Sequence, residues 1–190
     1  MSVNVYDFDN TLYRGESGIH MFFYYLKKRP WLICYGPRLI PGLIAYKRHQ
    51  IALDDVGGLL GGVLKKFMEG IENYEQDAKD FWDKHDHRLQ PFYKELQRPD
   101  DLIISAGPEQ SLKEVCRRLG VSRYIGTVIS EEGDLEFVCY RENKVKAFQE
   151  QYPDEQIDDF YTDSMNDKPL MDIAKRVFLV GKKGEMERIK

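Results

Sequence analysis

The sequence lacks several features that would indicate a specialised environment. It has only three cysteines in 190 residues, and their number and spacing suit neither a disulfide framework nor a metal site, so we expect reduced thiols. The formal net charge is -4, and the basic residues are scattered, which argues against binding to nucleic acid. No charged and apolar leader resembling a signal peptide precedes the first apolar residues. These absences together predict a cytoplasmic protein.

Long apolar runs are also missing. The most apolar stretch, residues 31–46 (WLICYGPRLIPGLIAY), is shorter than the roughly 20 residues of a membrane-spanning helix and contains Arg38 and two prolines. It is either a pair of buried helices or a surface that contacts a bilayer or an acyl chain. The second interpretation would place the protein peripherally at the inner face of the membrane. The sequence does not indicate an oligomeric state.

The pattern of apolar residues predicts an α/β fold. Val3, Val5 and Phe8 indicate a short buried strand, and residues 16–98 have mostly helical periodicity. After residue 98, strands and helices alternate, which is typical of a parallel sheet covered on both faces. The expected segments are strands at 101–107, 124–130, 157–163 and 176–181, a hairpin around 133–134, and helices at 108–120, 142–152 and 166–175.

This order predicts a doubly wound, Rossmann-like core with an insertion after its first strand. The core would comprise residues 1–15 and 99–190, and residues 16–98 would form a helical cap. A chain of 190 residues, of which 42% are hydrophobic and 32% charged, is large enough for such a core.

Two carboxylates follow the first strand and need an explanation. Asp7 and Asp9 are two residues apart, so on a strand they would face the same side and repel each other. A divalent cation is the simplest compensation. Ser105 and Asp163 lie near the ends of two later strands, and Lys144 lies near the start of a helix. Because ligands bind at the carboxyl edge of such sheets, these residues predict a site for phosphate and magnesium.

The residue types suit phosphoryl transfer. Asp7, together with Asp163 and a backbone carbonyl, could hold magnesium and attack phosphorus in line. Asp9 could protonate the leaving oxygen and later activate water. Ser105 and Lys144 could bind the transferring oxygens, as a hydroxyl donor and a positive charge.

Four motifs in this order resemble the haloacid dehalogenase-like phosphatase superfamily. They are DFDNT, ISAGPE, CYRENKVKAF and YTDSMND, and the helical insertion resembles the cap of subfamily IB, the branch that contains phosphoserine phosphatase. The resemblance implies magnesium ligands among Asp7, Asp9, Asp163 and Asp167, an aspartyl-phosphate intermediate, and an asparagine, Asn166, near the phosphate. Thr162 departs from the pattern, because glycine is common at that position.

Three alternatives concern substrate and activity. Glu16 stands where phosphoserine phosphatases read the substrate ammonium, although an acidic residue there also suits a helix N-terminus. The segments around residues 22–48 and the ending VGKKGEMERIK resemble the branch that includes phosphatidylglycerophosphate phosphatase, which would make the substrate a lipid phosphate. A third alternative is a binding or regulatory protein that kept the fold and lost the chemistry. The intact aspartates argue against it.

Overall fold

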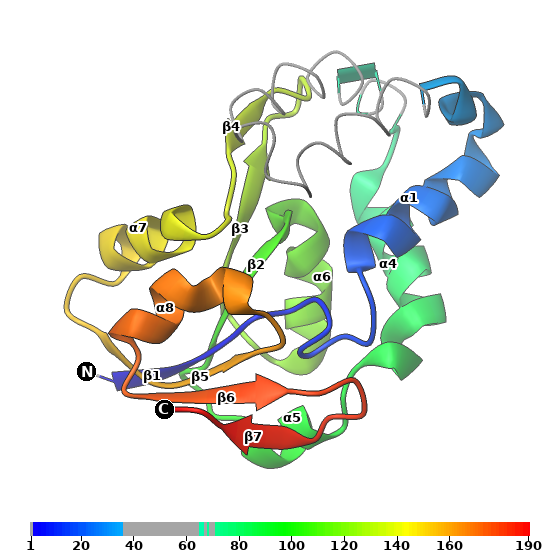
Figure 1. The fold of residues 1–190 in the computed structure, drawn as a ribbon. Helices are drawn as coiled ribbons and strands as arrows, with labels where there is room; N and C mark the ends of the chain where they lie inside the picture. The colour runs from blue at the N-terminus through cyan, green and yellow to red at the C-terminus, as the bar shows by residue number, and fades with distance from the viewer. Residues whose placement is uncertain (1, 36–64, 67, 69–70) are drawn as a thin grey trace.

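The computed structural model of the chain describes residues 2–35, 65–66, 68 and 71–190, and a seven-stranded sheet lies at its centre (Figure 1). The strand order is β4-β3-β2-β1-β5-β6-β7. The strands are β1 (Ser2–Tyr6), β2 (Leu102–Pro108), β3 (Arg123–Ile129), β4 (Leu135–Phe137), β5 (Gln156–Thr162), β6 (Arg176–Val180) and β7 (Met186–Arg188). β4 and β7 pair antiparallel at the two edges, and the five strands between them are parallel.

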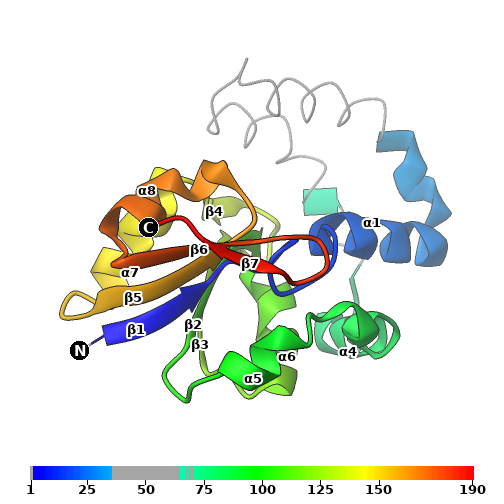
Figure 2. The ribbon, with the colours of Figure 1, turned by 60° about the horizontal axis from the view of Figure 1, so that its bottom comes forward.

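Helices cover both faces of this sheet, which confirms the predicted α/β fold. In Figure 2, α7 and α8 lie on one face, and α5 and α6 lie on the other. The helical elements are α1 (Ser17–Lys28), η1 (Pro30–Tyr35), α4 (Tyr74–His85), η2 (Asp86–Arg88), α5 (Phe92–Leu96), α6 (Glu109–Leu119), α7 (Glu142–Gln151), η3 (Met165–Asp167) and α8 (Lys168–Ile173).

The central strand β1 is buried on both faces, as its apolar sequence requires. Val3 and Val5 join the hydrophobic cluster that contains Phe148 of α7 and Leu170 of α8. Tyr6 belongs to the cluster on the opposite face. Because side chains alternate along a strand, the position after Tyr6 returns to the side of α7 and α8. This alternation decides where the next residue, Asp7, is directed.

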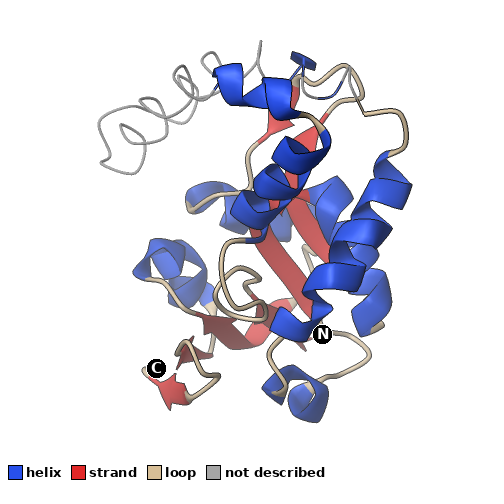
Figure 3. Ribbon diagram, turned by 90° about the vertical axis from the view of Figure 1, so that its right-hand side faces the viewer, coloured by secondary structure: helices blue, strands red, loops and turns tan. Residues whose placement is uncertain are grey.

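The described part of the insertion is helical (Figure 3), and its aromatic residues pack on the core. The indole of Trp82 in α4 meets the rings of Phe8 and Tyr13 edge-on, at centroid distances of 5.8 and 5.5 Å. Its Nε1 atom also donates to the carbonyl of Ser111 in α6 at 3.2 Å. A single hydrophobic cluster therefore joins α1 and α4 to the sheet.

The chain enters and leaves the insertion through two segments that pair with each other. The backbone N–H of Gln90 donates to Leu12 O at 2.7 Å, and that of Arg14 donates to Arg88 O at 2.9 Å. This pairing joins the loop after β1 to the segment that precedes α5. The division of the chain into a core and a cap at residues 15 and 99 stays a prediction.

Two short elements were not expected from the sequence. β7 has only three residues, all exposed, and α5 is a single five-residue helix between two prolines. Neither is long enough to show a periodic pattern, so pairing with β6 and packing on the sheet decide their structure.

Most of the apolar stretch 31–46, and part of the range 16–98 that was predicted to be helical, lies outside the described residues. Within the described part, Trp31 and Ile33 in η1 are exposed. No helix among the described residues has both the length and the apolar character needed to cross a membrane.

Candidate active site

Three side chains from distant parts of the sequence meet at the centre of the site. Asp7 follows β1, Lys144 lies in α7, and Asp167 is the last residue of η3. The Nζ atom of Lys144 lies 2.7 Å from Asp7 Oδ1 and 2.7 Å from Asp167 Oδ1. All three side chains are buried. The parallel pairing of β1 with β5 explains part of this meeting, because it brings the ends of both strands to one edge of the sheet.

Burial and charge act against each other in this cluster. Burial raises the pKa of Asp7, and the ammonium of Lys144 offsets only part of this effect. Burial alone would lower the pKa of Lys144, but Asp7 and Asp167 raise it above its ordinary value. Lys144 is therefore a charged ammonium that stabilises two buried carboxylates.

Two threonine hydroxyls complete the hydrogen bonding of these carboxylates. Thr11 Oγ1 donates to Asp7 Oδ2 at 3.2 Å, and Thr162 Oγ1 donates to Asp167 Oδ2 at 2.8 Å. Thr162 occupies the position where the sequence departs from the resembled pattern, and the structure gives it this role. Sequence reasoning assigned no role to either hydroxyl. The threonine two residues after Asp9 was the one available signal.

Asp9 contacts the start of α1. Its Oδ1 atom accepts the backbone N–H of Ser17 at 2.7 Å. Loss of hydration raises the pKa of Asp9 to about 6, although the hydrogen bonds from Ser17 oppose the shift. A carboxyl group with a pKa near neutrality can both donate and accept a proton, as acid–base chemistry requires.

Glu16, the residue before Ser17, is exposed. Its Oε1 atom accepts a hydrogen bond from Asn10 Nδ2 at 3.0 Å. Glu16 thus lies near Asp9 in the chain and at the surface of the site.

Ser105 and Asp163 occupy the expected edge without joining the ion-pair cluster directly. Ser105 in β2 is buried, and its Oγ atom accepts the backbone N–H of Gly107 at 3.0 Å. Asp163 follows β5 and is exposed. Partial loss of hydration and the nearby carboxylates of Asp167 and Glu16 raise the pKa of Asp163 to about 6. Asp163 thus directly follows its strand, as predicted, whereas Ser105 lies within β2, three residues before the strand ends at Pro108.

Asn166 in η3 contacts a residue that sequence reasoning missed. Its Oδ1 atom accepts a hydrogen bond from Arg141 Nη2 at 3.3 Å. Arg141 precedes α7 and lies three residues before Lys144. Its signal in the sequence is a cation within the motif CYRENKVKAF, three residues before the lysine.

The oxygen ligands suit magnesium, but they are not arranged around a metal position. In the part of the chain that the structure describes, no three His, Cys, Asp or Glu side chains stand close enough together to bind a metal ion. The ammonium of Lys144 lies between Asp7 and Asp167. The charges of Asp167 and Asp163 both raise the pKa of Asp7. Mg²⁺ prefers carboxylate oxygens as ligands, so the residue types fit this ion.

The fold and this cluster of carboxylates and lysine define a polar site at the carboxyl edge of a Rossmann-like parallel sheet. A model of the haloacid dehalogenase-like hydrolase family matches residues 5–172. The chain belongs to this family, as its four motifs predicted. A search of curated protein sequences finds no match.

Solved structures with similar folds share little sequence with this chain. A phosphoserine phosphohydrolase-like protein from Francisella tularensis has a TM-score of 0.60 at 18% identity, with 96% of this chain and 88% of that chain covered. A probable phosphoserine phosphatase from Vibrio cholerae has a TM-score of 0.63 at 15% identity, covering 93% of this chain and 55% of that chain. A protein of unknown function from Bordetella pertussis has a TM-score of 0.61 at 18% identity, covering 94% and 89%. At these identities the likeness shows a common fold.

Proposed function

We propose that the protein is a magnesium-dependent phosphomonoester hydrolase that works through an aspartyl-phosphate on Asp7. The observation that supports this most strongly is the buried Asp7 carboxylate, held by the ammonium of Lys144 at 2.7 Å. Burying these charges is costly, and a fold that only needed stability would do as well with apolar residues. A site in which Asp7 attacks a phosphate would account for this free-energy cost.

The reaction has two steps on the residues of this site. Asp7 attacks phosphorus, the bond between phosphorus and the leaving oxygen breaks, and Asp9 gives that oxygen a proton. Asp9 then accepts a proton from water as the water attacks the phosphorus of the aspartyl-phosphate. Phosphate leaves, and Asp7 is restored. Lys144 and the hydroxyl of Ser105 would stabilise the charge on the transferring oxygens.

Asp7, Asp163 and Asp167 would hold the magnesium ion, with Asp9 contributing a further oxygen. When bound, the metal would reduce the repulsion between the carboxylates and the incoming phosphate dianion. Lys144 pairs with Asp7 and Asp167, but one ammonium cannot neutralise all the carboxylates gathered here. The metal would offset the negative charge that remains.

The substrate is a small phosphorylated metabolite, such as phosphoserine, or a lipid phosphate, such as phosphatidylglycerophosphate. The exposed Glu16 near Asp9 favours a substrate with an ammonium group. The exposed Trp31 and Ile33 favour a lipid, and they begin the apolar stretch that would contact the membrane. The solved relatives named for phosphoserine support the first class.

Hydrolysis of p-nitrophenyl phosphate with and without magnesium tests the proposal. We expect turnover that stops with EDTA and returns when magnesium is added. The Asp7→Asn variant should be inactive and should form no aspartyl-phosphate. A wild-type protein that hydrolyses none of a panel of metabolite and lipid phosphates would instead be a binding or regulatory protein with this fold.

A further inference from the structure

Arg141 adopts a backbone conformation that is unfavourable for an arginine. Its φ of 49° and ψ of -117° are those of the first central residue of a type II′ turn, a position that glycine dominates. The turn is closed by the N–H of Asn143, which donates to Tyr140 O at 3.1 Å. Among the described residues, the other non-glycine residue with positive φ is Asn10, a type that tolerates it well. A strained arginine in place of glycine requires a reason that lies in its side chain.

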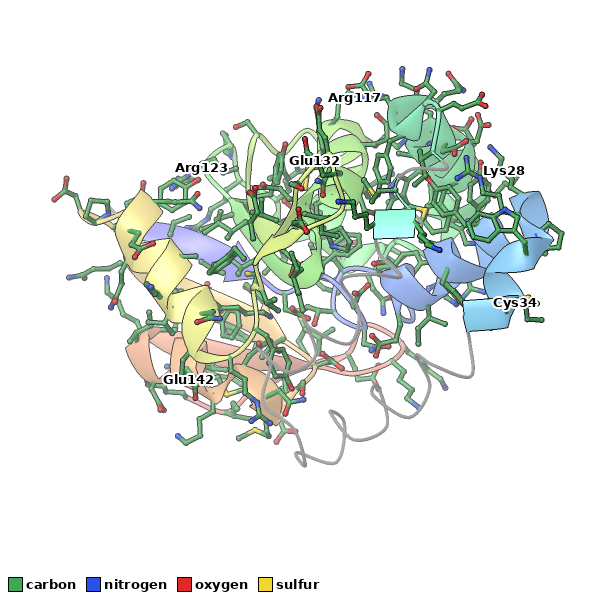
Figure 4. All side chains as sticks on the ribbon, turned by 90° about the horizontal axis from the view of Figure 1, so that it is seen from above. Lys28, Cys34, Arg117, Arg123, Glu132 and Glu142 are labelled. Carbon is green, nitrogen blue, oxygen red and sulfur yellow. The ribbon has the colours of Figure 1, made fainter. Side chains whose placement is uncertain are left out.

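The turn directs the guanidinium of Arg141 to the edge of the active site. The N–H of Lys144 donates to Arg141 O at 3.1 Å, so the strained residue begins the helix that carries the active-site lysine. Arg141 Nη2 reaches Asn166 Oδ1 at 3.3 Å, and Asn166 precedes the buried Asp167. Figure 4 shows the neighbouring Glu142 at the end of α7 that lies beside α8, which follows η3.

One lysine serves two acidic side chains at this site. Lys144 is already shared by Asp7 and Asp167, and Asp9 and Asp163 add further carboxylates at the same edge. A substrate that brings a second negative group therefore needs a further positive partner, and the guanidinium of Arg141 has the planar donor set that binds carboxylate or phosphate.

We propose that Arg141 is a specificity residue that binds a second acidic group on the substrate, beyond the phosphate that is transferred. The proposal rests on the proposed phosphatase function and narrows the substrate class to phosphomonoesters with a nearby carboxylate or second phosphate. Asn166 positions the guanidinium through its Oδ1 atom, and the type II′ turn fixes the point from which the side chain extends.

Matched substrates test the proposal. Phosphoglycolate and ethyl phosphate have similar size, but only phosphoglycolate carries a second acid, a carboxylate; ethylene glycol bisphosphate supplies a phosphate in its place. The wild-type protein should prefer one or both acidic esters in kcat/KM. Arg141→Gln should reduce that preference by about tenfold or more, mainly through KM, because a hydrogen bond to a charged group is lost. The acidic ester whose kcat/KM falls more in Arg141→Gln shows whether the guanidinium binds a carboxylate or a phosphate.

Two further variants separate recognition from folding. Arg141→Gly should remove the preference in the same way while raising the melting temperature by a few degrees, because glycine relieves the backbone strain. Lys146→Gln removes a positive charge from an exposed position of the same helix and should leave the preference unchanged. The proposal is supported if Arg141→Gln and Arg141→Gly both lose the preference for acidic esters, whatever the change in melting temperature.

Equal loss of turnover for acidic and neutral esters in Arg141→Gln, or no preference in the wild type, would overturn it. If no ester is hydrolysed, p-nitrophenyl phosphate included, then the proposed function has failed. Calorimetric titration with phosphoglycolate still decides the inference in that case. Arg141→Gln should bind it about tenfold more weakly than wild type, and equal affinities would rule out this role of Arg141.

Discussion

Lys144 Nζ lies 2.7 Å from Asp7 Oδ1, although the two residues are 137 positions apart in the sequence. Both side chains are almost fully buried. Replacing Lys144 by Met would leave Asp7 and Asp167 buried without their counter-charge. We expect the free energy of unfolding to fall by about 3–5 kcal/mol, the usual cost of breaking a buried ion pair. Urea denaturation would measure this loss.

Lys168→Met is the matched control, because the ion pair of Lys168 with Asp172 is exposed and should contribute roughly 0–1 kcal/mol. A double variant, Lys144→Met with Asp7→Asn, should lose less stability than the sum of the two single changes, since both charges of one pair are removed together. Additive losses would mean that the two residues do not interact in solution.

Asp7 and Asp9 should respond differently to the loss of charge. Asp7→Asn removes the nucleophile and should abolish turnover for every ester. Asp9→Asn should slow turnover by about a hundredfold or more, and most for esters with poor leaving groups, because those depend on protonation. Steady-state kinetics on aryl phosphates of graded leaving-group pKa would show the difference. If Asp7→Asn keeps turnover and depends on the leaving group as Asp9→Asn does, the roles of nucleophile and acid–base are wrongly assigned.

Thr162→Val should destabilise the protein by about 1–3 kcal/mol, because it removes the hydroxyl that donates to the buried carboxylate of Asp167 at 2.8 Å. Thr162→Ser keeps the hydroxyl and should recover most of the loss. Thermal or urea unfolding of the two variants would compare them. A serine variant as unstable as the valine variant would assign the effect to lost packing.

Glu114 in α6 should make stability depend on pH in the acid range. Hydrogen bonds from Arg117 outweigh burial and, with Arg118, lower the pKa of Glu114 to about 2 from 4.5. A carboxyl group with a lowered pKa in the folded state stabilises the protein above its unfolded pKa. This contribution is lost as the pH falls through about 2.

Glu114→Gln should therefore be less stable than wild type at pH 7, and the difference should shrink below about pH 4.5 and vanish near pH 2. Unfolding by urea at several pH values would follow it. Glu75→Gln removes an exposed ion pair with Lys113 and should change stability little. A difference between wild type and Glu114→Gln that is constant with pH would show that Glu114 acts through packing alone.

The sequence by itself determined the alternation of elements and the position of the acidic residues. β1, β2, β5 and β6 are short apolar runs, and α6 ends at Gly120 with a positive φ, so local composition and period were enough to predict them. Asp7 and Asp163 follow two of these strands, and parallel pairing necessarily brings strand ends to one edge. The sequence could therefore predict that these acidic residues lie at one edge of the sheet, but it did not indicate the roles of Thr11, Thr162 and Arg141.

The tertiary structure decided which of those residues touch. Only packing of α7 beside α8 brings Lys144 between Asp7 and Asp167, and only the fold gives the hydroxyl of Thr162 a buried carboxylate to bind. The strain at Arg141 is invisible in sequence, because a backbone dihedral angle depends on the turn that surrounding contacts impose. Contacts across long chain separations have no local pattern, so the sequence could name these residues or their neighbours but not their partners.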